Sequence, residues 1–299
     1  MIKKELKSKL SLLELHNKLK RPLVLDGAMG SLLQRRGIES DKFLWYSKAN
    51  LDNPNIVKSI HLEYIEAGAD IITTNTFRTN PISLKQSGYP IDQNEFVYRS
   101  VQIAVDARED KEIIIAGSNA PAEDCYQTER TISKYSLDYN HKKHIELLWE
   151  NGADIIWNET HSHWDEIKII CEFCTYNSLP FIVGLYFTDN LKILSGEPVK
   201  EAVQLINGYK PLAIGFNCIK PDNFKEYFIE NKLPTNWGFY FNCGAGNVSD
   251  RDISCGINPD QYIDVVKDYL PENPVFIGSC CGSSPLHTEK IKEYFDEIY

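Results

Sequence analysis

The sequence predicts a (β/α)8 barrel, the fold in which eight parallel strands alternate with helices. Eight short runs rich in Val, Ile, Leu and aromatic residues recur along the 299-residue chain, and segments with helical spacing separate them. The runs are continuously apolar, which is typical of parallel strands buried on both faces. A near-repeat supports this unit, because residues 66–72 (EAGADII) and 150–156 (ENGADII) each span a helix end and the following strand.

A doubly wound sheet is the alternative architecture. It usually has fewer strands and a Gly-x-Gly-x-x-Gly turn after the first strand. Here the first strand is followed by Asp26-Gly27-Ala28-Met29-Gly30, which lacks that pattern. No linker-like stretch divides the chain, so we expect residues 1–299 to form a single barrel domain, with residues 1–20 as an N-terminal helical extension.

In chain order, an amphipathic helix over 5–20 is expected to cover one end of the fold, and Asn53-Pro54 and Gly68 bound the first long helix. The stretch 120–140 is polar with scattered aromatics and is predicted to be a large loop. The strands are expected at 22–25, 69–75, 113–119, 153–160, 181–187, 212–218, 237–243 and the run from Asn273 to Ser279. The remaining helices are expected near 93–108, 141–151, 164–176, from 201, 222–230, 259–269 and 285–297.

Composition excludes several classes of protein. A net charge of −10 argues against nucleic-acid binding, which needs clustered Lys and Arg. No apolar run approaches the 18 residues of a membrane span, and no signal-peptide core is present, so we expect a cytoplasmic protein. Eight cysteines at this length indicate free thiols or metal ligands rather than a disulfide scaffold. Cys171 and Cys174 lie on one face of a helical pattern, which favours core packing over zinc binding.

Polar residues follow the strands at the end where barrel enzymes carry their chemistry. Thiols follow strands six, seven and eight, and carboxylates follow strands one and four. Cys218, Cys280 and Cys281 can converge on one ion, and three thiolates on a tetrahedral zinc leave one position open, as in catalytic sites. Adjacent strand residues point to opposite faces, so both Cys280 and Cys281 can ligate only from an irregular turn. Gly278 and Gly282 are expected to supply that turn.

Seven segments of the chain form a recognisable set: Asp26-Gly27-Ala28-Met29-Gly30, Leu44-Trp45, Asn50-Leu51-x-Asn53-Pro54, Gly68-Ala69-Asp70-Ile71-Ile72-x-Thr74-Asn75-Thr76-Phe77, Glu159-Thr160, Asn217-Cys218 and Gly278-x-Cys280-Cys281-Gly282. With these segments the chain resembles a known family, the zinc-dependent homocysteine S-methyltransferases. This family includes betaine–homocysteine methyltransferase, S-methylmethionine-dependent enzymes and the homocysteine domain of cobalamin-dependent methionine synthase. The resemblance covers roughly residues 20–295. Two departures are Ser279, where the family usually has Gly, and Cys243 after Asn242, where it usually has Ala or Ser.

The resemblance implies a role for each site residue. Cys218, Cys280 and Cys281 would bind Zn²⁺ and activate the substrate thiol, with Asn242 near the fourth position when substrate is absent. Glu159, assisted by Asp26, would bind the ammonium group of homocysteine, because a buried ammonium needs a carboxylate partner. The backbone around Gly27 and Thr74 would hold its carboxylate.

The implied reaction is methyl transfer to the thiol of homocysteine, giving methionine. The favoured donor is a free sulfonium such as S-methylmethionine; a corrinoid protein supplied in trans comes next, followed by betaine. No Asp-x-His-x-x-Gly cobalamin signature is present. Trp45, Tyr46 and Phe77 are expected either to form an aromatic wall for a cationic donor or to pack at the barrel rim. Another thiol or a selenol remains an alternative acceptor.

Three other interpretations stay open. His161-Ser162-His163 beside Glu159 would suit a different metal site, although histidines in this position are more often solvent-facing caps. A non-catalytic zinc- or thiol-binding regulator would use the same cysteines without turnover. A vicinal redox disulfide between Cys280 and Cys281 is the third.

Overall fold

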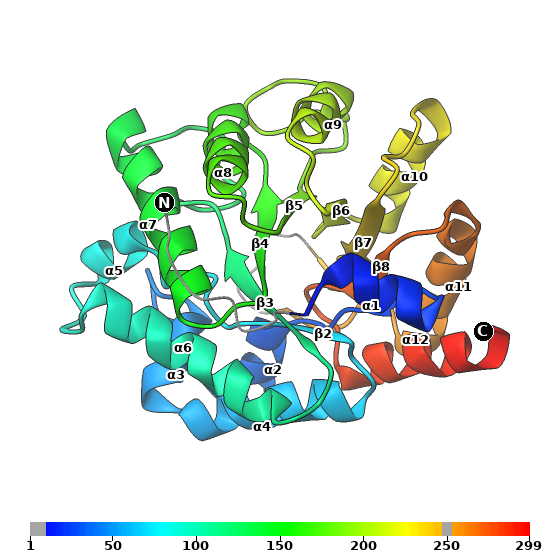
Figure 1. Cartoon of the computed structure of the whole chain (residues 1–299), viewed down its shortest axis with the longest axis horizontal. Helices are drawn as coiled ribbons and strands as arrows, with labels where there is room; N and C mark the ends of the chain where they lie inside the picture. Colours follow the sequence, from blue (N-terminus) through cyan, green and yellow to red (C-terminus); the bar gives the residue numbers. More distant parts are fainter. Residues whose placement is uncertain (1–9, 247–252) are drawn as a thin grey trace.

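The structure is a computed structural model that describes residues 10–246 and 253–299. Within these residues, eight parallel strands gather at the centre and helices surround them (Figure 1). This confirms the (β/α)8 barrel and excludes the doubly wound alternative. The strands are β1 (Leu23–Val24), β2 (Ile71–Thr73), β3 (Ile114–Asn119), β4 (Ile155–His161), β5 (Phe181–Leu185), β6 (Ala213–Asn217), β7 (Trp237–Phe241) and β8 (Phe276–Ser279).

Hydrogen bonding runs continuously around the barrel. The strands pair in the order β1-β8-β7-β6-β5-β4-β3-β2, all parallel. A single parallel bridge between Leu25 and Ile71 connects β1 to β2, and the Asp26 amide donates to the Ile71 carbonyl over 3.0 Å. The carboxyl ends of all eight strands therefore meet at one rim, where the predicted site residues lie.

The helices agree with the sequence pattern where that pattern is long. The helices over 93–108 and 164–176 have the predicted bounds. Five short elements were not predicted, namely the helices α2 (Met29–Arg35), α3 (Ala49–Asp52) and α5 (Pro81–Ser87) and the 3-10 turns η1 (Tyr46–Lys48) and η2 (Leu270–Glu272). The helices are α1 (Leu12–Leu19), α2 (Met29–Arg35), η1 (Tyr46–Lys48), α3 (Ala49–Asp52), α4 (Pro54–Glu66), α5 (Pro81–Ser87), α6 (Gln93–Arg108), α7 (Lys134–Glu150), α8 (Trp164–Tyr176), α9 (Val199–Gly208), α10 (Pro221–Glu230), α11 (Pro259–Tyr269), η2 (Leu270–Glu272) and α12 (Pro285–Ile298).

The largest boundary error concerns α7, which begins at Lys134 instead of 141. Its first turns are polar and carry Tyr135, which is 81% exposed, so they lack the apolar spacing that predicts a helix. Ser133 caps the helix by accepting the Ser136 amide at 3.1 Å. The loop after β3 therefore spans 120–133 rather than 120–140.

Interior side chains fill the barrel. Trp157 of β4 lies 4.7 Å from the Phe276 ring, centroid to centroid, and its Nε1 donates to the Tyr240 hydroxyl over 2.8 Å. Leu12 and Leu15 of α1 are buried in the same cluster, so this helix covers one end of the barrel as predicted, although residues 1–9 of the predicted segment lie outside the described residues. Cys171 and Cys174 are fully buried in the outer core, which confirms core packing.

The near-repeat in the sequence corresponds to one arrangement of hydrogen bonds that occurs twice, each time around an aspartate. Asp70, just before β2, accepts the Val24 amide at 2.8 Å and pairs with Arg21 at 2.6 Å. Asp154, just before β4, accepts the Ile115 amide at 2.8 Å and pairs with Arg108 at 2.7 Å. In each case the carboxylate reaches the backbone of the neighbouring strand. None of the helices in the described residues is both long and apolar enough to cross a membrane.

Candidate active site

A cavity of about 680 Å³ opens among the loops that follow the strands. Seven of the eight predicted site residues line it, and they come from strand ends all around the barrel. Those seven are Asp26, Gly27, Thr74, Glu159, Cys218, Cys280 and Cys281. The eighth, Asn242, does not line the cavity; its Oδ1 accepts the Gly244 amide at 2.7 Å.

The three predicted thiols do converge. The Sγ atoms of Cys218, Cys280 and Cys281 all lie within 4.8 Å of one another, a grouping that could hold a metal ion. Cys280 and Cys281 have their sulfur atoms 3.9 Å apart. Three thiolates about 2.3 Å from a tetrahedral zinc stand roughly 3.8 Å apart, so this spacing fits that ion. The three residue types and the spacing of Cys280 and Cys281 fit a zinc centre.

Cys218 and Cys280 form a disulfide bond in this structure, and their Cα atoms are 5.7 Å apart. Metal binding by all three residues requires this pair in its reduced form, because the thiolate is the ligand. The vicinal disulfide between Cys280 and Cys281 is not formed, since a disulfide bond is only about 2.05 Å long.

The backbone after β8 explains how adjacent cysteines reach one point. Cys280 and Cys281 follow the last strand residue and lie in a turn, where Gly282 adopts a positive φ of 83°. A Cβ on Gly282 would also come within 2.6 Å of the Gly244 Cα, so a side chain is excluded there. Gly278 behaves differently from the prediction: it lies inside β8, and its missing Cβ makes room for Leu25 of the neighbouring segment.

Helix α2, which the sequence reading missed, holds this turn in place. The Ser31 hydroxyl accepts the Gly282 amide at 3.0 Å, and Arg35 donates to the carbonyl oxygens of Gly282 and Ser283 at 2.7 and 3.2 Å. The spacing of Ser31 and Arg35 places them on one helical face. This i,i+4 spacing of Ser31 and Arg35 was the feature of the sequence that could have indicated the helix. Two residues after β7, the amide of buried Cys243 donates to the Cys281 carbonyl at 2.9 Å, so its backbone also holds this turn.

Cys218 reaches the cluster through an unusual backbone conformation, with a positive φ of 54°. Its neighbour Asn217 links it to the carboxylate strand: Asn217 accepts the Thr160 amide at 3.1 Å and donates to the Thr160 hydroxyl at 2.8 Å. Thr160 also has a positive φ, of 62°, and directly follows Glu159. Such conformations cost of order 1–3 kcal/mol and cluster at functional sites. Here they aim a thiol and a carboxylate at one cavity.

The two predicted carboxylates both have a raised pKa. Burial raises the pKa of Glu159 to about 7, although its carboxylate accepts a hydrogen bond from the Ser118 hydroxyl. Burial also raises the pKa of Asp26 well above its usual range, and the nearby Glu159 charge adds to that effect. Asp26 accepts the Thr73 amide at 2.8 Å. Two neighbouring carboxylates that are shielded from solvent and repel each other are suited to a cationic ligand group.

The predicted backbone site is only partly available. The Thr74 amide donates to the Ala116 carbonyl at 2.9 Å, and the Thr74 hydroxyl pairs with Thr76 at 2.7 Å. Gly27 faces the cavity in a crowded position, where a Cβ would meet the hydroxyls of Ser283 and Tyr64 at 2.6 and 2.8 Å. Within the described residues, no acceptor is bonded to the Gly27 amide.

Aromatic residues form part of the cavity wall. Trp45 and Phe77 both line it, with ring centroids 5.5 Å apart. Tyr46 is buried in the core beneath and does not line the cavity. The loop 120–133 also contributes Cys125 and Tyr126 to the cavity wall, which was not predicted. Its polar composition gave no indication of this.

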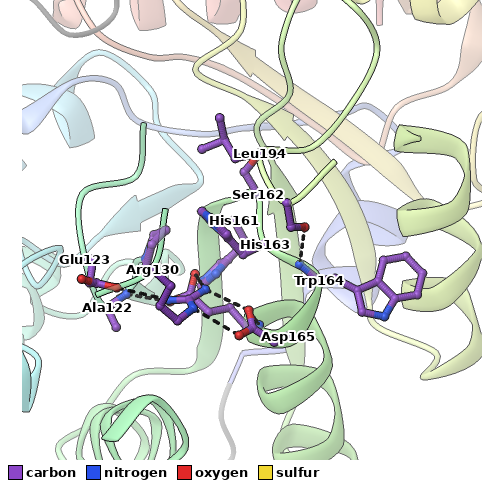
Figure 2. A network of polar contacts seen from close by, with 12 residues as sticks. Ala122, Glu123, Arg130, His161, Ser162, His163, Trp164, Asp165 and Leu194 are labelled. Carbon is purple, nitrogen blue, oxygen red and sulfur yellow. Dashed lines mark hydrogen bonds and ion pairs between the residues drawn. The ribbon is translucent and has the colours of Figure 1, made fainter. Parts of the chain in front are cut away.

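A partly buried polar network fixes that loop to the first turn of α8 (Figure 2). Arg130 binds both carboxylate oxygens of Asp165 at 2.8 and 3.1 Å and lies 3.6 Å from Glu123. The Glu166 carboxylate accepts the Ala122 amide at 2.9 Å and pairs with His141 at 3.0 Å. The 120–133 loop is therefore anchored from outside the cavity, since Arg130 does not line it.

His161 and His163 belong to this network, and the prediction that they are solvent-facing caps is wrong. His161 is fully buried and its Nε2 bonds the Asn119 carbonyl at 3.1 Å. His163 is 8% exposed and bonds the Thr128 carbonyl at 3.1 Å. Carbonyl partners distant in sequence account for their burial. Among the described residues, the thiol cluster is the group that could hold a metal, and these histidines are not part of one.

The fold and the cavity define a (β/α)8-barrel protein with a tri-cysteine candidate metal centre at the carboxyl ends of its strands. A family model described as homocysteine S-methyltransferase matches residues 23–295. The chain therefore belongs to the homocysteine S-methyltransferase family and is a methyltransferase, as its resemblance to that family implied.

Comparison with individual proteins supports this family assignment. The chain is 26% identical over 294 residues to the homocysteine S-methyltransferase of Escherichia coli, covering 90% of this chain and 94% of that one. It is 25% identical over 297 residues to the selenocysteine Se-methyltransferase of Brassica oleracea, covering 88% and 85%. The crystal structure of the E. coli homocysteine methyltransferase MmuM in its metallated form shares the fold, with a TM-score of 0.79 at 24% identity over 95% of this chain and all of that one.

Proposed function

We propose that this protein transfers a methyl group from a small sulfonium donor, such as S-methylmethionine, to the thiol of homocysteine in a zinc-dependent reaction that gives methionine. One observation carries the proposal: three cysteines, the buried carboxylate of Asp26 and the half-buried carboxylate of Glu159 face the same cavity. The thiols suit a thiophilic metal, and the carboxylates suit the ammonium of an amino acid whose side chain ends in a thiol.

Cys218, Cys280 and Cys281 would hold the zinc ion. When bound, zinc would lower the pKa of the homocysteine thiol so that the sulfur is deprotonated and nucleophilic at neutral pH. The chain's own contribution is to fix the three ligands. Ser31 and Arg35 hold the turn after β8, and the two residues with positive φ direct Cys218 and Glu159 inward.

The carboxylates would position homocysteine. Glu159 and Asp26 would pair with its ammonium group, which also relieves their mutual repulsion. The Gly27 amide would receive its carboxylate, since the Thr74 amide is already bonded to Ala116. Asn242 would have to leave its bond with Gly244 in order to approach the metal.

The donor would bind beside Trp45 and Phe77, whose ring faces attract a cationic sulfonium. In the transfer, the homocysteine sulfur forms a bond to the methyl carbon while the bond between that carbon and the donor sulfur breaks. The electron pair of the broken bond stays on the donor, which leaves as a neutral thioether. With S-methylmethionine, both products are methionine, and the proton from the homocysteine thiol is released.

Metal analysis combined with a methionine-formation assay tests this proposal. Alanine substitution of Cys218 or Cys281 is expected to remove bound zinc and methionine formation together. The matched control is Cys255→Ala, because Cys255 is exposed and does not line the cavity. Retention of both zinc and activity in Cys218→Ala would overturn the assignment of the metal ligands.

A donor panel with homocysteine and zinc-loaded protein tests the donor. We expect methionine from S-methylmethionine, with betaine and a methylated corrinoid protein inactive. Conversion with only one of the latter two would overturn the sulfonium assignment. Zinc binding without methionine formation from any donor would instead indicate a regulatory protein.

A further inference from the structure

Arg78 is a cationic residue in the cavity wall, and no carboxylate of the described residues pairs with its charge. It follows β2, is half-buried and lines the cavity. Its Nη1 donates to the carbonyl oxygens of Pro121 and Glu123 at 3.1 and 2.6 Å. In the part of the chain that the structure describes, Arg21, Arg108 and Arg130 each pair with a carboxylate within 4 Å, whereas Arg78 does not.

The surroundings make this unpaired charge unusual. The chain has a net charge of −10, and only two basic side chains line the cavity among the described residues. The other is Lys42, which is exposed and lies 5.0 Å from the Phe43 ring. A guanidinium presents five donors in a planar fork that matches a carboxylate. With only Nη1 engaged by the loop carbonyls, the remaining donors of Arg78 are available for a ligand.

Arg78 also lies next to the surfaces that the donor would use. Its guanidinium carbon is 5.3 Å from the centre of the Phe77 ring, which in turn contacts Trp45. Cys125 connects this region to the thiol cluster: burial raises its pKa to about 12, and the charges of both Arg78 and Cys281 lie close enough to affect it. An aromatic pair for a sulfonium and a guanidinium for a carboxylate therefore stand side by side.

We propose that Arg78 binds the carboxylate of the methyl donor, so that it selects donors in which a sulfonium methyl and a carboxylate belong to the same small molecule. This inference rests on the proposed methyl transfer. It divides the cavity into two parts: the homocysteine ammonium lies at Glu159 and Asp26, and the donor carboxylate lies at Arg78.

The test compares S-methylmethionine with its methyl ester, which keeps the sulfonium and lacks the negative charge. For the wild-type enzyme, we expect the KM of the ester to exceed that of the acid roughly 10- to 100-fold, the range for one charged hydrogen-bonding contact. In Arg78→Met, the KM of the acid should rise to that of the ester, while the KM of homocysteine changes less than about twofold. Arg78→Lys should restore part of the preference because it retains a point charge.

Arg130→Met is the matched control, because Arg130 anchors the same loop through Asp165 and Glu123 (Figure 2). Arg130 does not line the cavity. If Arg78 only supports the loop, both variants will weaken acid and ester equally, and the proposal is overturned. A rise in the KM of homocysteine in Arg78→Met also overturns it, because the guanidinium would then bind the other substrate.

Calorimetric binding of S-methylmethionine and its ester to the zinc-loaded protein separates this inference from the proposed function. A preference for the acid that disappears in Arg78→Met supports the carboxylate contact even if no methyl transfer occurs, in which case only the proposed reaction fails. Equal binding of acid and ester to the wild-type protein overturns the role of Arg78.

Discussion

Replacing Glu159 with Gln should stabilise the ligand-free protein and weaken substrate binding at the same time. The substitution keeps the shape of the side chain and an oxygen for the Ser118 hydroxyl, and it removes the charge. Because burial raises the pKa of Glu159 from 4.5 to about 7, the folded state holds this proton more tightly than the unfolded state. That stabilisation is fully present below about pH 4.5 and is lost as the pH rises through 7.

The magnitude follows from the two pKa values. A pKa change from 4.5 to about 7 corresponds to a contribution of about 3 kcal/mol to the free energy of unfolding. Between pH 5 and pH 8 the wild type loses about 2 to 3 kcal/mol of this contribution. The free energy of unfolding of Glu159→Gln, measured relative to the wild type, should therefore rise by this amount between these two pH values. Only the ionised form of Glu159 can pair with the ammonium group of a bound amino acid. With a pKa of about 7, the ionised fraction of Glu159 increases about tenfold from pH 6 to pH 8. Methionine should therefore bind the wild type about tenfold more tightly at pH 8 than at pH 6.

Urea unfolding at pH 5, 6, 7 and 8 measures the first effect, and calorimetric titration with methionine measures the second. Methionine is a suitable ligand because none of its own groups changes charge substantially in this range. Glu129→Gln, an exposed substitution in the loop after β3, is the control and should leave both pH profiles unchanged. Identical pH dependence of unfolding in the wild type and Glu159→Gln would refute the buried, proton-binding role of this residue.

Three further substitutions, one of them with a matched control, test how the barrel supports the site. Gly238→Ala places a Cβ 2.5 Å from the Phe276 carbonyl oxygen and should lower the free energy of unfolding by about 1–3 kcal/mol. Its control is Gly208→Ala, which has open space around it and should raise the free energy of unfolding by up to about 1 kcal/mol. Urea denaturation distinguishes the two outcomes. Tyr240→Phe leaves the buried Trp157 indole N–H without its acceptor and should cost about 1–3 kcal/mol in the same assay; no change would mean that water replaces the hydroxyl. Asp70→Asn removes the charge that faces buried Arg21 and should lower the thermal midpoint by several degrees, corresponding to about 3–5 kcal/mol; an unchanged midpoint would contradict the importance of this pair.

The barrel was predictable because its signal is local. Each strand is a buried apolar run, and the predicted bounds of the helices over 93–108 and 164–176 hold because their apolar residues recur at helical spacing. Since parallel strands deliver their carboxyl ends to one rim, the same pattern also predicted that Cys218, Cys280 and Cys281 would meet.

Contacts between distant segments were not predictable in the same way. Arg130 binds Asp165 from 35 positions away, and His163 bonds Thr128, so neither the anchoring of the 120–133 loop nor the burial of the histidine is written in a local pattern. Helix α2 was missed because seven residues are too few to establish a period. The Thr74 amide was assigned to a ligand because a sequence does not reveal that a strand partner, Ala116, already accepts its hydrogen.

The paired aspartates at the starts of β2 and β4 have a consequence for the opposite end of the barrel. A shift of a strand by one residue turns every side chain to the other face. Asp154 fixes β4 to the Ile115 amide, and Glu159, five residues later, points into the cavity only in that register. Asp70 does the same for β2 and Thr74. Substitutions at these remote carboxylates should therefore alter substrate binding through strand alignment, although neither residue lines the cavity.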